Sequence, residues 1–149
     1  MALPPLIPRS VLFGNPDRTS PALSPDGTLL GYVAPDDGVL NVWVEPLDGS
    51  APARAVTHDR DRGVRIYAFC HDDRSLVYLQ DTAGDESWRV SVLDLASGAA
   101  RLVTPEREVQ ARILAHNRWH PTTVLVGLND RDPRFHDVHS LDLVTGASP

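Results

Sequence analysis

One short pattern occurs repeatedly in the sequence at a nearly constant spacing. Three pairs of segments match one another without a gap: "SPDGTLLGYV" with "CHDDRSLVYL", "ARAVT" with "ARLVT", and "LDLASG" with "LDLVTG", with offsets of 46, 47 and 48 residues. An internal repeat of this length is typical of proteins built from stacked copies of one supersecondary unit. The sequence therefore predicts three copies of a unit of about 47 residues after residue 18.

Each copy has the periodicity of β-strands. In "VRIYAFC", the residues Val64, Ile66, Ala68 and Cys70 alternate with larger or polar ones, and we expect these four on one face of a strand. Turn-forming Asp, Gly and Asn separate this segment from "SLVYLQ", "WRVSVLDL" and "ARLVT". Four antiparallel strands recurring at this spacing are typical of a β-propeller, in which each sheet is a blade.

The predicted fold class is therefore all-β, with about three four-stranded antiparallel propeller blades. We expect an N-terminal arm over residues 1–18 and a partial β-propeller over 19–149, with blades at about 19–58, 64–105 and 109–146. The third blade is incomplete, because "LDLVTGASP" ends at the turn that precedes the fourth strand in the other copies. Three blades are fewer than the four to eight that close a ring. The propeller is thus predicted to be open.

An open ring has consequences for the isolated chain. Its two outer blade faces lack a neighbour, and we expect both to expose apolar residues such as those of "TLLGYV" and "TVLVGL". An unpaired strand at the edge of the third blade would also invite pairing with another chain. Self-association of the isolated chain is the expected result. The chain is either a truncated protein, natural or engineered, or a complete small protein that needs partner chains.

The segment "PEREVQARILAHNRW" has two interpretations. Its composition favours a helix of about three turns. However, Val109, Ala111 and Ile113 alternate with polar residues, and the repeat aligns them with the first strand of the second copy. A strand is therefore predicted here.

Composition excludes several classes of protein. A chain of 149 residues with 42% hydrophobic content can form one globular domain, and a net charge of −6 with scattered basic residues argues against nucleic-acid or membrane partners. The sequence shows no signal peptide and no apolar run long enough to span a bilayer, so a cytoplasmic location is expected. Cys70 is the single cysteine and cannot form an internal disulfide; it is expected to be a small buried core residue.

Several segments resemble a known family. These are "PLIPRSVLFGNPDRTSPALSPDGTLLGYV", "LNVWV", "YLQDTAGDESWRV" and "VLVGLNDRDPRFHDVHSLDL". They resemble the N-terminal β-propeller of bacterial prolyl oligopeptidase-type serine peptidases, the group that includes dipeptidyl and acylaminoacyl peptidases. Two local departures are Ser87, where the family pattern has Asn after "GDE", and the turn "HDDR", which replaces an Asp-Gly turn.

The resemblance implies a second, C-terminal α/β-hydrolase domain that carries the catalytic serine, aspartate and histidine. This chain contains no G-x-S-x-G nucleophile elbow, and its glycine-flanked Ser50 and Ser97 fall in predicted hairpins. No catalytic residue, cofactor or metal is therefore predicted. We expect a non-catalytic propeller segment whose parent would be a serine peptidase and which restricts peptide access to the hydrolase domain. The alternative is a free-standing protein-binding module without enzymatic activity.

Two loops are candidate contact sites. Peptidases of the resembled family can hold a substrate's amino terminus with propeller carboxylates, which implies this role for Asp85 or Glu86 in the acidic loop "DTAGDES". A solvated hairpin loop is the other interpretation. Arg131, Asp132 and Arg134 form either a salt-bridged turn or a contact with the hydrolase domain or further blades, the partners that the resemblance implies.

Two histidine clusters have ligand-like spacing but predict no metal site. His116 and His120 are four residues apart, yet no H-E-x-x-H motif accompanies them. His136, Asp137 and His139 lie on a predicted strand, where period two places His136 on one face and the other two on the opposite face. Hydrogen bonding within the hairpin is the expected role of this second cluster.

Overall fold

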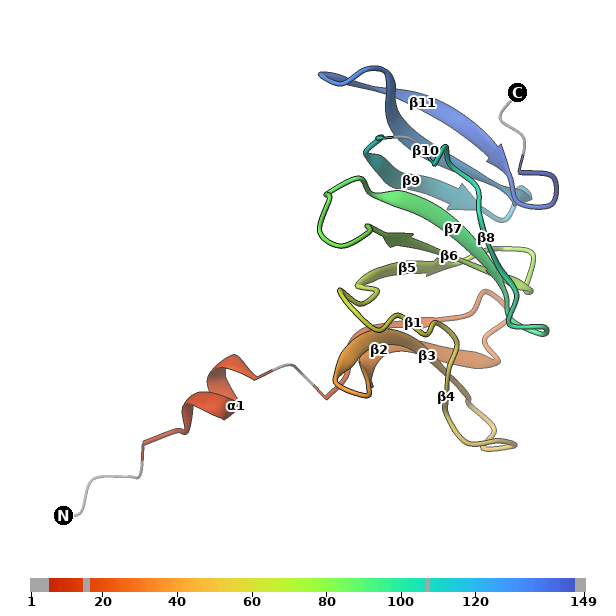
Figure 1. The fold of residues 1–149 in the computed structure, drawn as a ribbon. Helices are drawn as coiled ribbons and strands as arrows, with labels where there is room; N and C mark the ends of the chain where they lie inside the picture. The colour runs from red at the N-terminus through yellow and green to blue at the C-terminus, as the bar shows by residue number, and fades with distance from the viewer. Residues whose placement is uncertain (1–5, 15–16, 107, 147–149) are drawn as a thin grey trace.

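The computed structural model describes residues 6–14, 17–106 and 108–146. Nearly all regular structure in these ranges is β (Figure 1). The single described helix, α1 (Arg9–Phe13), is one turn that begins after Pro8 and buries no residue. No helix within the described ranges is long and apolar enough to cross a membrane.

The strands form three antiparallel sheets that follow one another along the chain. The strands of the first sheet are, in order, β1 (Thr19–Leu23), β2 (Leu29–Asp36), β3 (Val39–Pro46) and β4 (Arg54–Ala55). Those of the second are β5 (Ile66–Phe69), β6 (Ser75–Gln80), β7 (Arg89–Asp94) and β8 (Ala100–Leu102). Those of the third are β9 (Ala111–Asn117), β10 (His120–Asp132) and β11 (Phe135–Asp142).

The predicted fold class is confirmed. Two sheets have four strands and the third has three within the described residues, so the third blade is incomplete and the ring is open. The segment with two interpretations forms strand β9, and Ala111 pairs with Leu128 of β10. Ala111 and Ile113 are two residues apart, and both pack in the apolar cluster between the second and third sheets. This alternation fits a strand and not a helix.

The first hairpin of each sheet closes in the same way. The side chains of Asp26, Asp72 and Asn117 each accept a hydrogen bond from the backbone N–H two residues later, with N···O distances of 3.1, 3.1 and 2.9 Å. In the second hairpin, Asp73 takes the place of Gly27 and adopts a positive φ of 51°. Asp tolerates this left-handed conformation better than most residues do. The "HDDR" turn therefore keeps the geometry without glycine.

The three sheets stack face to face, and the second lies between the other two (Figure 1). On strand β6, the adjacent residues Leu76 and Val77 are both 0% exposed, but they belong to different apolar clusters. Leu76 packs with Val33 and Val42 of the first sheet, whereas Val77 packs with Val126 of the third. A strand buried on both faces explains the continuous apolar run in "SLVYL".

The predicted common face in "VRIYAFC" is wrong in part. Ala68 and Cys70 do face the third sheet, and Cys70 is buried as expected. Val64 instead packs with the first sheet, and Ile66 is 53% exposed. The reason is that strand β5 begins only at Ile66, so Val64 lies in the preceding connection and is free of the strand's alternation.

The repeated "AR-x-VT" segments tie one sheet to the next. Arg54 Nη2 donates a hydrogen bond to the carbonyl oxygen of Leu95, 2.6 Å away on the second sheet. Arg101 makes the equivalent bond to the carbonyl of Leu143 on the third sheet. The threonines that follow, Thr57 and Thr104, each accept a hydrogen bond from a backbone N–H of the third strand of their own sheet.

The expectation of exposed outer faces is correct for the third sheet and only in part for the first, where Leu23 of β1 is 60% exposed but the middle of the face is covered. On the first sheet, Tyr32 points away from the second sheet but is only 3% exposed. Arg18 lies over its ring, with Cζ 4.5 Å from the centroid, and Trp43 donates from Nε1 to the carbonyl of Ala34. On the third sheet, Leu114, Leu125 and Val138 remain exposed.

Replacement of Leu76 by Ala should lower the free energy of unfolding by about 2 to 5 kcal/mol, because the cavity lies between two sheets that cannot both close over it. Urea denaturation followed by circular dichroism measures this loss. Leu47→Ala is the matched control, since Leu47 is exposed in a turn and should cost little. Equal midpoints for the two variants would show that Leu76 is not a core residue.

Replacement of Val138 by Glu should reduce self-association of the isolated chain. Val138 is 66% exposed on the outer face of the third sheet, on the edge strand β11 itself, and a charge there opposes both apolar contact and strand pairing. Size exclusion coupled to light scattering measures the mass. Val11→Glu on the exposed helix α1 is the control. A monomeric wild-type chain with one sharp thermal transition would contradict this prediction.

Candidate acidic pocket

One end of the stacked sheets carries the functional candidates. The hairpins β2–β3, β6–β7 and β10–β11 emerge at this end, because they join equivalent strands of successive sheets (Figure 1). The connections from β4 to β5 and from β8 to β9 reach the same end and flank the β6–β7 hairpin. Side chains from three separate segments can therefore meet around the second sheet.

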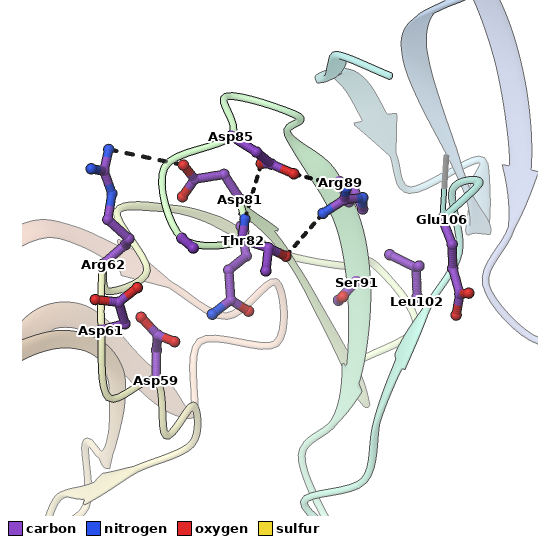
Figure 2. A pocket seen from close by; sticks show the side chains of 12 residues that line it. Asp59, Asp61, Arg62, Asp81, Thr82, Asp85, Arg89, Ser91, Leu102 and Glu106 are labelled. Carbon is purple, nitrogen blue, oxygen red and sulfur yellow. Dashed lines mark hydrogen bonds and ion pairs between the residues drawn. The ribbon is translucent and has the colours of Figure 1, made fainter. Parts of the chain in front are cut away.

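These segments enclose a pocket of about 640 Å³ (Figure 2). Its charged lining residues are five carboxylates and two arginines: Asp59, Asp61, Asp81, Asp85, Glu106, Arg62 and Arg89. Polar and apolar groups complete the wall, among them Gln80, Thr82, Ser91 and Leu102. The excess of carboxylates makes the pocket suited to a positively charged group.

Asp85 holds the acidic loop in shape. Its Oδ1 accepts hydrogen bonds from the backbone N–H groups of Thr82 and Ser87, at 3.2 and 3.0 Å, and its Oδ2 lies 3.1 Å from Arg89 Nη2. Desolvation alone would raise the pKa of Asp85, but these hydrogen bonds and the Arg89 charge together lower it. Asp85 therefore stays ionised, and Ser87 supplies the backbone donor where the family pattern has Asn.

Asp81 is the buried carboxylate of the pocket. Its side chain is 1% exposed, and within the described part of the chain neither oxygen has a hydrogen-bond partner. Arg62 is its counter-ion, with Nη2 3.9 Å from Oδ2 (Figure 2). The loop makes room for Arg62 at Gly84, because a Cβ there would lie 3.0 Å from Arg62 Nη1. The same glycine has a φ of +82°.

The predicted residues of this loop have different places. Asp85 lines the pocket, whereas Glu86 is exposed at a positive φ of 55° and does not line it. Sequence analysis did not single out Asp81 or Arg62. The sequence feature that could have identified Asp81 is its position as a carboxylate directly after Gln80, the last residue of the buried strand β6.

Arg131, Asp132 and Arg134 lie apart from the pocket, on the hairpin between β10 and β11. They form a salt-bridged turn. Arg131 binds both oxygens of Asp137, with Nε–Oδ2 and Nη2–Oδ1 distances of 2.6 and 2.9 Å, and Arg134 Nη2 lies 2.8 Å from Asp132 Oδ2. The second predicted role, a contact with another domain, remains a prediction.

The histidine clusters do not form a metal centre within the residues that the structure describes. His139 Nε2 lies 3.3 Å from Asp130 Oδ1, and Asp137 is held by Arg131. The strand register places Asp137 opposite Leu128 and His139 opposite Val126, both of which face the second sheet. His136 lies on the other face, beside Gly127, as the period of two predicts.

Comparison with known proteins gives the class of the chain. No family model matches the sequence. The chain is 45% identical over 141 residues to dipeptidyl aminopeptidase BIII from Pseudoxanthomonas mexicana, covering 95% of this chain and 20% of that protein. It is 31% identical over 147 residues to dipeptidyl peptidase family member 6 from Caenorhabditis elegans, covering 94% of this chain and 20% of that protein.

A solved structure with the same fold is the β-propeller domain of the Trilobed protease from Pyrococcus furiosus, described as having an open velcro topology. Its TM-score is 0.64 at 17% identity, over 89% of this chain and 42% of that one. The chain spans about a fifth of the length of the curated relatives it matches. The predicted resemblance is confirmed: the chain is a propeller portion of the kind found in prolyl oligopeptidase-family peptidases.

Replacement of Arg62 by Met should destabilise the chain by about 1 to 3 kcal/mol, because it leaves the Asp81 carboxylate buried without a counter-ion. The double variant Arg62→Met/Asp81→Asn should regain most of this loss, since a neutral amide needs no counter-ion. Urea denaturation measures both values. Arg60→Met is the matched control, because Arg60 pairs with Asp36 at the surface. Additive effects of the two substitutions would show that the pair does not interact.

Proposed function

We propose that this chain is the non-catalytic propeller segment of a prolyl oligopeptidase-type serine peptidase, and that it restricts peptide access to a hydrolase domain outside this chain. The 45% identity to a dipeptidyl aminopeptidase over 141 residues carries the proposal. The propeller fold supports it, because the chain itself lacks the G-x-S-x-G elbow and needs a second domain to take part in hydrolysis.

The acidic pocket gives this segment a role in substrate binding. We infer that its carboxylates attract the protonated amino group of an unblocked peptide, as the resemblance implies for Asp85 or Glu86. Asp85 stays ionised but is already bound by Arg89 and two backbone donors. It therefore adds negative electrostatic potential to the pocket and does not bind the amino group directly. The exposed carboxylates of the lining are Asp61, Asp85 and Glu106. Because Asp85 is already engaged, Asp61 and Glu106 are better placed for direct contact.

The salt-bridged hairpin of the third sheet supports a contact between domains. Arg131, Asp132 and Arg134 project at the same end as the pocket, and their ion pairs fix the shape of the turn. A rigid polar turn suits an interface within one protein, where polar contacts are common. In this proposal the hairpin contacts the hydrolase domain, and the pocket lies beside the path of the substrate.

A chimeric enzyme tests the proposal. This chain replaces the corresponding segment of dipeptidyl aminopeptidase BIII, and kcat/KM is measured with a free dipeptidyl nitroanilide, its N-acetylated form and unfolded casein. The chimera should cleave the free dipeptide and discriminate against the other two substrates. Asp61→Asn/Glu106→Gln should raise KM about tenfold, the effect of losing a charged contact worth about 1.4 kcal/mol.

Two controls accompany this experiment. Asp48→Asn changes an exposed carboxylate in the turn at the opposite end of the first sheet and should leave KM unchanged. The isolated chain should not react with a fluorophosphonate. Hydrolysis of casein as fast as of the dipeptide would contradict the access role. An inactive chimera that folds normally would favour the free-standing binding module.

A further inference from the structure

The contact between the second and third sheets contains a pair of histidines at its turn end. His71 belongs to the turn between β5 and β6, and His116 belongs to β9. Their ring centroids are 5.2 Å apart, with an angle of 40° between the ring planes. Each sheet thus contributes one imidazole, and no covalent connection holds the two together except the chain itself.

His116 points into the contact between the sheets. It pairs in register with Val124, which is buried in the apolar cluster that joins the second and third sheets. Its Nδ1 is buried and has no hydrogen-bond partner within the described residues. A proton on this nitrogen would place a charge in a site that offers it no acceptor.

The charged groups of the neighbouring elements have partners of their own. In the turn, Asp72 Oδ1 accepts from the backbone N–H groups of Arg74 and Ser75, and the Arg74 side chain pairs with Asp94 of β7. The remaining titratable or charged groups nearby are Cys70, Asp73, Arg118, His120 and Asp142. Burial first, and then Asp72, raises the pKa of the Cys70 thiol to about 12, so it stays neutral.

Other partners are local as well. Arg118 lies over the Trp119 ring, 4.5 Å from its centroid, and Asp142 accepts from the N–H groups that follow it in its own turn. Asp73 and His120 are exposed. No carboxylate in the described residues forms an ion pair with His116, so a second positive charge beside His71 would meet repulsion without compensation.

We propose that the His71–His116 pair is a pH-sensitive latch, and that acidification opens the contact between the second and third sheets from this end. Burial, and then the charge of His71, lowers the pKa of His116 below its ordinary value of 6.5. The open or unfolded form therefore binds the proton more readily than the closed form does. The latch stabilises the closed form fully above pH 6.5 and loses this effect as the pH falls through the lowered pKa.

Urea unfolding of the full 149-residue chain at pH 8 and pH 5.5 tests the latch. The wild-type midpoint should be lower at pH 5.5, and the difference should be clearly smaller in His116→Gln, which cannot be protonated. His120→Gln is the matched control, because His120 is exposed at the start of β10, and it should behave as the wild type. Equal pH dependence of wild type and His116→Gln would overturn the proposal.

A second measurement needs no buried substitution. The ring carbon resonances of His116, followed by NMR from pH 8 to pH 4.5, should show that His116 titrates below the ordinary histidine value of 6.5. His71→Gln, on the turn, should move the His116 midpoint upward toward the ordinary value. A His116 midpoint at or above 6.5, or no change in the His71 variant, would overturn the latch even if His116→Gln fails to fold.

Discussion

The burial of the second sheet on both of its faces is the constraint on which the rest of this structure depends. Leu76 and Val77 are adjacent in sequence and completely buried, yet they belong to separate apolar clusters on opposite sides of strand β6. A sheet of this kind cannot exist in water without a neighbour on each side. The connections between sheets are therefore forced to run around the ends of the stack, where they form the walls of the acidic pocket.

The sheets were predictable from the sequence because a repeat shows which residues have equivalent roles. Asp26 and Asp72 align in the sequence and cap equivalent turns, and the strand assignment of 111–117 followed from the same register against its helical composition. The incomplete third sheet was predicted for this reason too. The alternation of apolar residues predicted the buried face less well where a strand begins later than the pattern indicates. Val64 precedes the start of β5 and packs against the first sheet.

The pocket and the histidine pair could not be predicted in the same way. Arg62 and Asp81 are 19 residues apart, and His71 and His116 are 45 apart, so their proximity depends on how the sheets stack. The covering of Tyr32 by Arg18 likewise joins an arm to a sheet, and hydrophobic pattern alone says nothing of it. Each of these contacts occurs once among the described residues, so a comparison of the repeated units does not predict it.

The hydrogen bonds from Arg54 to Leu95 and from Arg101 to Leu143 affect how the number of sheets in such a chain can change. Each joins the fourth strand of one sheet to the end of the third strand of the next, with the same donor and the same kind of acceptor. Removal of one whole unit would bring Arg54 to the carbonyl of Leu143 in place of that of Leu95. Duplication or loss of a unit thus preserves the junction, and the number of sheets can change during evolution without a new interface.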